Sequence, residues 1–184
     1  MTNIYEFSSY LGGVARPSQF RVHINFPSIL VTDSNEAKHS ATFLTKTASL
    51  PSYRTEPIEI FYRGRKINEA GEPTFEEWEC TIINSSDFRI RKALEEWSNA
   101  IGSPDTVYGL TRPETYKGTI LVEQLDRAGE TLRVYKLFGA FPTATGSIEL
   151  DYDNGNQVET YTPTFAYDYF TVGGKELLES ATSI

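Results

Sequence analysis

The chain has 184 residues, of which 39% are hydrophobic and 13% aromatic, and its formal net charge at pH 7 is −8. This length and composition predict a single domain over residues 1–184 with a sizeable core, and they exclude a disordered chain. The acidic balance argues against a protein that wraps a nucleic-acid backbone, because such a protein needs clustered Lys and Arg. It does not exclude a surface along which nucleic acid passes.

The first segment, residues 1–14, is predicted to be an N-terminal arm. Between Ile4 and Leu11 the spacing of apolar residues fits a short helix or an extended arm, and Gly12-Gly13 interrupts it. No stretch is long and apolar enough for a membrane-spanning helix, and the first residues lack the basic start and apolar run of a secretory signal. We therefore expect a protein without membrane anchoring that is made and assembled in the cytoplasm.

Strands and loops alternate in the next part of the chain. Residues 20–26 alternate between apolar and polar side chains, which predicts a half-buried strand. Residues 33–40 are polar and predict a loop, and residues 41–47 predict a short strand. A second loop at residues 52–56 precedes another alternating strand at residues 58–62.

A basic loop, a turn and a strand follow. Residues 63–68 form the basic loop, and the Gly and Pro within residues 70–73 indicate a turn. Trp78, Cys80 and Ile82 then share one side of an alternating pattern, which predicts a half-buried strand. The only cysteine, Cys80, is therefore predicted to be a small buried apolar residue, and it excludes an internal disulfide framework.

The strongest helical pattern comes next. Residues 84–87 offer N-cap side chains, and apolar residues recur at helical spacing as far as Ile101, where Gly102 ends the pattern. We expect the principal helix at about residues 86–101. Residues 102–117 predict a long irregular loop.

Two antiparallel pairs complete the predicted fold. Residues 119–125 and 132–141 predict a hairpin. Residues 147–152 and 160–169 predict a second pair around a turn at residues 153–155. One face of the last strand is aromatic and is predicted to face the core. Its members are Tyr161, Phe165, Tyr167 and Tyr169.

The elements together predict a mainly β protein. About eight strands with one principal flanking α-helix favour a β-sandwich or β-barrel. Residues 171–184 are predicted to form a C-terminal tail, either helical or mobile.

The sequence carries no catalytic motif. A nucleophile elbow, a zinc-protease His pair and a phosphate-binding glycine loop are all absent from it. His23 and His39 have no Cys, Asp or Glu at ligand spacing and are expected to be packed or solvated. Neighbouring acids such as Glu149 and Asp151 are typical of a solvated strand face rather than of a glycosidase pair. We therefore predict a protein that is not an enzyme and holds no cofactor or metal.

One stretch carries a more specific pattern. It reads Arg65-Lys66-Ile67-Asn68-x-Ala70-Gly71-x-x-Thr74-Phe75-x-x-Trp78, followed by a helix that contains Trp97 near its end. This pattern resembles that of the tail tube proteins of T4-like contractile-tailed bacteriophages, and further segments match in the expected order over roughly residues 15–170. They are Ala15-Arg16-Pro17, Ala48-x-Leu50-Pro51, Phe141-Pro142-Thr143, Ile148-x-Leu150-Asp151, Glu159-Thr160-Tyr161 and Phe165-x-Tyr167-Asp168-Tyr169.

The resemblance implies a structural virion protein. Its fold would be a β-sandwich with a flanking helix, assembled into hexameric rings that stack into a hollow tube for genome ejection. The implied partners are further copies of the chain, tail sheath, baseplate and tail-terminator proteins, and viral DNA that passes through the lumen without specific binding. The implied location is the virion tail.

Three alternatives remain open at this point. A baseplate tube initiator and the tube of a related contractile injection system share the fold that the resemblance implies. A carbohydrate-binding module belongs to a different class, and it would use Tyr161, Phe165 and Tyr167 as an exposed sugar platform.

Two sets of residues are candidate sites. The basic loop and its neighbours, with mixed charges that can pair with another copy, predict a subunit or ring interface. This set is Arg63, Arg65, Lys66, Asn68, Glu69 and Glu72. Several acids on outward strand faces are expected to face the channel, because an acidic wall repels the DNA backbone and keeps its passage fast. This set is Glu59, Glu77, Glu79, Glu123, Glu149, Asp151 and Asp168.

Overall fold

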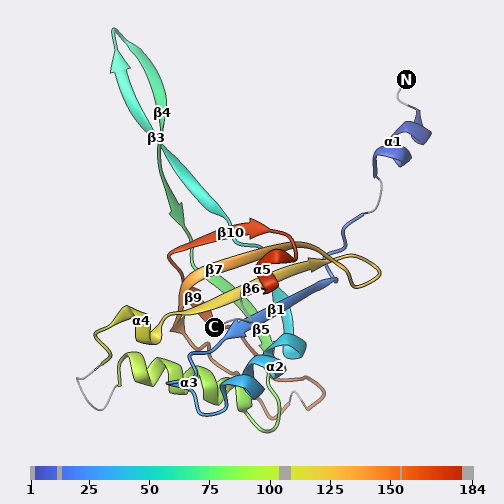
Figure 1. The fold of residues 1–184 in the computed structure, drawn as a ribbon, viewed down its shortest axis with the longest axis vertical. Coiled ribbons are helices and arrows are strands. Elements are labelled where there is room, and N and C mark those ends of the chain that lie inside the picture. Colours follow the sequence, from blue (N-terminus) through green and yellow to red (C-terminus); the bar gives the residue numbers. More distant parts are fainter. Residues whose placement is uncertain (1–2, 12–13, 104–108, 154, 180–184) are drawn as a thin grey trace.

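A long two-stranded arm projects from a body of antiparallel strands in the computed structural model of the chain (Figure 1). The structure describes residues 3–11, 14–103, 109–153 and 155–179. The tip of the arm marks one end of the long axis, and the larger helices of the body lie toward the other end. The arm tip and the helical end are therefore separated by the body.

Eight strands form the body within the described residues, namely β1 (Phe20–Asn25), β2 (Thr45–Ala48), β5 (Trp78–Ile83), β6 (Gly118–Leu125), β7 (Thr131–Ala144), β8 (Thr160–Tyr161), β9 (Thr164–Ala166) and β10 (Tyr169–Gly173). They form one antiparallel sheet in the order β1-β6-β7-β9-β5-β2, with β10 paired to β7 and β8 paired to β5. The predicted mainly β class is confirmed, and so is the hairpin that became β6 and β7. Long β7 pairs with β6 and β10 in one half of the sheet, and with β9, which leads to β5 and β2, in the other half.

A bend in β7 at Gly139 allows one strand to serve both halves. Strand β10 pairs with β7 as far as Phe138, and β9 takes over at Phe141. Gly139 lies between them with a φ of 66°, and a Cβ there would lie 2.1 Å from a carboxylate oxygen of Asp168. The predicted strand at residues 160–169 is divided among three short strands, β8, β9 and β10. The breaks fall where Pro163 cannot donate a ladder hydrogen bond and where the chain turns at Asp168.

The core lies between the two halves of this sheet and helix α3 (Arg89–Ile101). Trp97 of α3 is fully buried, its ring contacts those of Phe26 and Phe165, and its Nε1–H donates to the Tyr116 carbonyl at 2.7 Å. The principal helix is therefore confirmed, although it begins at Arg89. Trp78, Cys80 and Ile82 of β5 face the same core, which confirms the predicted alternation and the buried cysteine.

Helix α2 (Ser34–Leu44) corrects the prediction of a polar loop and a short strand at residues 33–47. Only Ala37 and Ala41 of this helix are buried, one turn apart, where the helix packs against β1 and α3. Two alanines make an apolar stripe too weak to separate from a polar loop by periodicity. The predicted strand shrinks to β2.

The arm corrects a second prediction. Strands β3 (Tyr53–Tyr62) and β4 (Arg65–Phe75) pair along the arm. Residues 53–56 and 65–68 of the two predicted loops, and the predicted turn at residues 70–73, are therefore strand. The chain reverses instead at Arg63 and Gly64, whose φ angles of 48° and 78° are those of a primed two-residue turn. Gly71 permits close pairing, because a Cβ there would lie 2.4 Å from the Glu56 carbonyl oxygen.

The remaining segments are short. The N-terminal residues contain helix α1 (Ile4–Leu11), and the predicted irregular loop after α3 contains α4 (Pro113–Tyr116). The predicted strand at residues 147–152 is irregular. The predicted C-terminal tail contains α5 (Glu176–Glu179), and its last residues, 180–184, lie outside the described residues.

Candidate assembly surfaces

The arm exposes apolar side chains along its whole length. Every residue of β3 is exposed, and the exposed large hydrophobic residues of the arm include Phe61 at 71% and Tyr62 at 61%. One face of the ribbon gathers Ile58, Ile60 and Ile67, because Ile60 and Ile67 are directly opposite each other. A large exposed apolar surface of this kind marks an interaction site, since an isolated hairpin is marginal in water.

The base of the arm is fixed to the body by aromatic contacts. Tyr53, the first residue of β3, and Phe75, the last residue of β4, pair at this base and pack against Phe170 of β10 with ring centroids 6.1 and 5.8 Å apart. Phe75 also contacts Tyr167, at 5.9 Å. These contacts fix the direction in which the arm leaves the body.

The predicted interface residues all lie on this arm and are exposed. They lie on the turn and on β4, and basic side chains gather at the tip, where the Arg63 guanidinium lies 5.3 Å from the centre of the Tyr62 ring. Lys66 is already paired with Glu59 on the opposite strand. Sequence reasoning missed the apolar face of the arm, although the alternation on both sides of Arg63-Gly64 was the signal for a hairpin.

The predicted lumen acids do not gather on one wall of a single subunit. Glu59 lies on the arm, Glu77 and Glu79 lie at the start of β5 and are exposed, and Asp168 binds the Lys117 ammonium at 2.7 Å. Glu149 and Asp151 lie on the irregular segment between β7 and β8. These positions therefore lie on different elements of the subunit.

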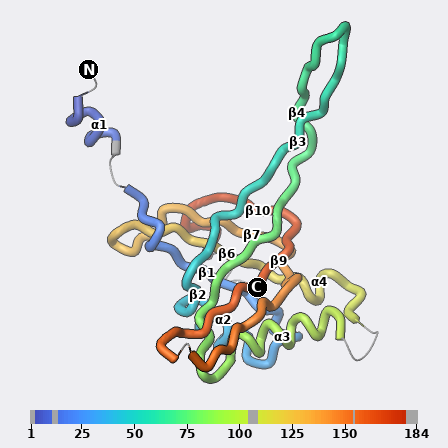
Figure 2. Tube along the Cα trace, turned by 180° about the vertical axis from the view of Figure 1, so that it is seen from behind, coloured from blue at the N-terminus to red at the C-terminus, as the bar shows by residue number. Residues whose placement is uncertain are grey.

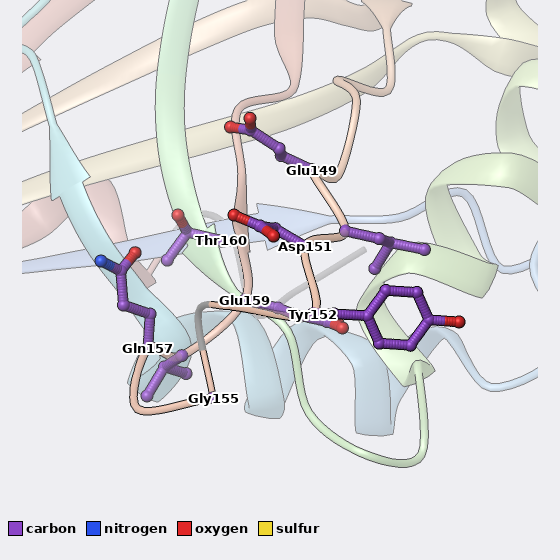
Figure 3. Close-up of a pocket in the computed structure, with 9 residues that line it drawn as sticks. Glu149, Asp151, Tyr152, Gly155, Gln157, Glu159 and Thr160 are labelled. Atoms are coloured by element: carbon purple, nitrogen blue, oxygen red, sulfur yellow. The ribbon is translucent and has the colours of Figure 1, made fainter.

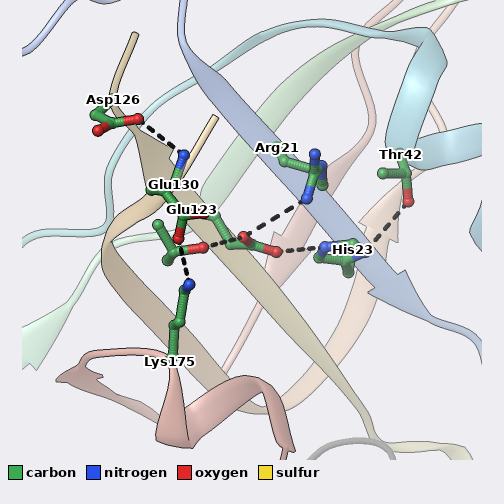
Figure 4. Close-up of polar contacts among 8 residues, drawn as sticks. Arg21, His23, Thr42, Glu123, Asp126, Glu130 and Lys175 are labelled. Carbon is green, nitrogen blue, oxygen red and sulfur yellow. Dashed lines mark hydrogen bonds and ion pairs between the residues drawn. The ribbon is translucent and has the colours of Figure 1, made fainter. Parts of the chain in front are cut away.

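Glu123 is a correction, because it does not lie on an exposed strand face. Its side chain is 2% exposed and its carboxylate lies 2.5 Å from His23 Nε2, while Thr131 donates to it at 3.2 Å (Figure 4). Burial alone would raise the pKa of this carboxyl, but the hydrogen bond and charge of His23 and the charge of Arg21 hold it below its ordinary value. His23 is a packed histidine, as predicted, and Thr42 of α2 lies within hydrogen-bond distance of its other ring nitrogen.

The described part of the chain offers little for catalysis or metal binding. It contains no group of three or more His, Cys, Asp or Glu side chains placed to hold a metal ion, and none of its helices is long and apolar enough to cross a membrane. Burial, and then the charge of Glu79, raise the pKa of the Cys80 thiol to about 12, so it is not a nucleophile at neutral pH.

The sugar-platform alternative is wrong for this chain. Tyr161 and Phe165 are buried at 2% and 0% exposure, and Tyr167 is half-buried beneath the base of the arm. A stacking platform requires exposed ring faces, and these rings belong to the core and its border.

Comparison with known proteins gives a consistent family. A family model described as "Phage tail tube protein" matches residues 15–173. The chain is 31% identical over 161 residues to the tail tube protein gp19 of Enterobacteria phage T6, with 86% of this chain and 92% of that protein covered, and gp19 of Enterobacteria phage T4 gives the same values. Among solved structures, the sheath/tube terminator of the extracellular contractile injection system PVC has a TM-score of 0.63 at 15% identity, over 88% of this chain and 97% of that chain. This last likeness concerns the fold.

Proposed function

Since the chain belongs to the phage tail tube protein family, we propose that it assembles into hexameric rings that stack into a hollow tube for genome ejection. Its relatives are structural tail tube proteins and not enzymes, and it is a structural component of a phage tail. In this proposal the subunits assemble in the host cytoplasm, and the tube contacts the sheath, baseplate and terminator proteins of the tail.

The observation that carries the proposal is the arm. A ribbon of 10 and 11 residues that buries almost none of its apolar side chains is a liability in a monomer. In an assembly, the same apolar face is covered by a neighbouring copy. A contact between two different surfaces of identical subunits either closes into a ring or continues as a filament, and a stacked tube uses both kinds of contact.

The interface set on the arm is assigned to the contact between stacked rings. Arg63, Arg65, Lys66, Asn68, Glu69 and Glu72 are exposed on a projection that extends away from the body along the long axis of the subunit (Figure 2). Mixed charges on such a projection favour one register of stacking over others, because like charges would face each other in the wrong ones.

The channel wall is assigned to exposed acids of the body. Glu77 and Glu79 are the strongest of the predicted set, because Glu123 is buried and the charge of Asp168 is offset by Lys117. The net charge of −8 per subunit favours a wall that repels the DNA backbone. A structure of an assembled ring tests this assignment, and a wall lined mainly by Lys and Arg would contradict it.

Electron microscopy of the purified protein tests the central proposal. The wild-type protein should form rings and hollow tubes at high concentration, whereas a tube initiator would form rings that do not lengthen. A variant with Arg65→Glu and Lys66→Glu should remain folded by circular dichroism but polymerise less. A wild-type protein that stays monomeric at high concentration would contradict the proposal.

A further inference from the structure

A segment at the far end of the molecule has properties complementary to those of the arm tip. The described residues 145–153 and 155–159, here called the acidic loop, lie between β7 and β8 in the chain and toward the helical end of the long axis, whereas the arm tip lies at the other end (Figures 1 and 2). The loop contains Glu149, Asp151, Asp153 and Glu159 and no Lys, Arg or His. The two surfaces are therefore opposite in charge and opposite in position.

The acidic loop exposes apolar groups as well as acids. Leu150 is 80% exposed and Val158 is 67% exposed, and the Tyr152 side chain is also fully accessible. The loop encloses a hollow of about 570 Å³, and the carboxylates of Glu149 and Asp151 point to the same side of the loop while the Tyr152 ring points to the other (Figure 3). A surface that combines a hollow with exposed aliphatic, aromatic and acidic groups fits a basic aromatic partner.

The body holds both ends of this loop. At its start, Arg91 Nη1 donates to the carbonyl oxygens of Thr145 and Gly146 at 2.9 and 2.5 Å. At its end, the backbone and side chain of Asn84 donate to Glu159 at 2.9 and 2.8 Å. The hydrogen bonds at both ends therefore fix the position of the loop against the body.

The arm tip has the matching chemistry. The tip is the two-residue turn Arg63-Gly64, which is flanked by the paired residues Tyr62 and Arg65. It carries two guanidinium groups and one exposed aromatic ring. Among the described residues, neither Arg63 nor Arg65 forms an ion pair with a carboxylate of its own chain, in contrast to Lys66. The tip therefore retains its positive charge for another molecule.

We propose that the arm tip of one subunit docks on the acidic loop of a second copy in the adjacent ring. This inference rests on the proposed function, and it names the surface that receives the arm. Because the tip and the loop lie at opposite ends of the long axis, each subunit can donate one tip and accept another. A subunit whose tip is bound still has an unoccupied acidic loop, so the same contact repeats along the tube from ring to ring.

The test exchanges the charges of the two surfaces. The tip variant carries Arg63→Glu and Arg65→Glu, and the loop variant carries Glu149→Lys and Asp153→Lys. A control variant with Asp33→Lys and Glu114→Lys makes the same change in net charge as the loop variant, at exposed acids outside both surfaces. Circular dichroism and thermal unfolding establish that each variant is folded, and sedimentation with electron microscopy separates rings from tubes.

The tip and loop variants should each form rings but raise the protein concentration needed for tubes at least about tenfold, because like charges then face each other. The control should form tubes like the wild type. A mixture of tip and loop variants in equal amounts should restore tubes, since every tip then meets a loop of opposite charge in alternating rings. A chain that carries both sets of changes should restore them as well.

Several results would overturn the inference. Normal tubes from the loop variant, or two defective variants that do not restore each other, would show that the tip docks elsewhere. Normal tubes from the tip variant combined with weaker retention of duplex DNA would assign the tip to nucleic acid. A wild-type protein that forms neither rings nor tubes would instead contradict the proposed function, so the two failures are distinguishable.

Discussion

Strand β5 of the body and strand β3 of the arm follow the same period of two, and the fold treats their apolar residues in opposite ways. Trp78, Cys80 and Ile82 of β5 are at most 2% exposed. Ile58 and Ile60 of β3 are 54% and 42% exposed. Alternation therefore determines which side chains share a face, but a second layer of structure has to cover that face before it becomes a core. Among the described residues no such layer covers the arm, and we propose that another copy covers its apolar face.

Truncation of an aromatic side chain in the core should have the largest effect on the free energy of unfolding, and it tests whether the buried residues of the body carry the stability of the subunit. Trp97→Ala removes a buried side chain that packs against Phe26 and Phe165, and it should lower the free energy of unfolding by about 3–5 kcal/mol. Phe61→Ala removes an exposed ring of the arm and is the matched control, with an expected change within about 0.5 kcal/mol. Urea unfolding of the unassembled subunit measures both, and similar losses would contradict the contrast.

The two carboxylate pairs offer a second test, with a smaller expected effect. Glu123→Gln weakens the buried interaction with His23 and should cost about 1–3 kcal/mol at pH 7. Glu59→Gln removes the exposed pair with Lys66 and should cost at most about 1 kcal/mol. Unfolding of the unassembled variants at pH 7 measures the difference.

The pH dependence of stability sharpens the same test. The pKa of Glu123 is lowered in the folded protein, so its stabilising contribution is present above the ordinary pKa of 4.5 and is lost as the pH falls through the lower folded value. The wild type should therefore lose this contribution below about pH 4.5, and Glu123→Gln should flatten that part of the curve. Equal acid sensitivity of the wild type and the variant would contradict the assignment.

The elements that sequence patterns predicted correctly are those whose local pattern and tertiary environment agree. The alternation around β5 and the helical spacing up to Ile101 both reflect the core that covers them. The sequence pattern does not reveal helix α2, because its buried face consists only of Ala37 and Ala41 and the helix is stabilised by packing against α3 rather than by local propensity. The glycine at position 71 does not mark the turn predicted at residues 70–73, because it allows β4 to approach Glu56 of β3 closely.

The candidate site residues also differ in how far the sequence alone could place them. The residues of the predicted interface set share one surface because they are neighbours in sequence and remain neighbours on the arm, while their role as an interface stays a prediction. Glu123 could not be recognised as buried, because its partner His23 lies 100 residues away and only the pairing of β1 with β6 brings them together. Leu150 and Tyr152 fit the alternation of one strand face and are nevertheless exposed on an irregular segment, since alternation alone does not show whether a partner strand exists.

A small effect on subunit stability, of the same size as that of Phe61→Ala, is expected for Ile60→Thr in the arm. Threonine keeps the β-branched shape that suits a strand, and Ile60 is already 42% exposed, so the free energy of unfolding should change by at most about 0.5 kcal/mol. The same substitution at Ile82, which is 0% exposed, places a hydroxyl in the core and should cost about 1–3 kcal/mol.

For tube assembly, the substitution at Ile60 should have a larger effect than the substitution at Ile82. Ile60→Thr inserts a hydroxyl into the apolar face that we assign to a neighbouring copy, so the variant should fold like the wild type and yet form fewer tubes by electron microscopy. Ile82→Thr should form tubes at temperatures well below its unfolding transition, because its side chain does not reach the surface of the subunit. If Ile60→Thr instead unfolds as readily as Ile82→Thr, the apolar face of the arm is covered within the subunit, and the distinction between the two regions fails.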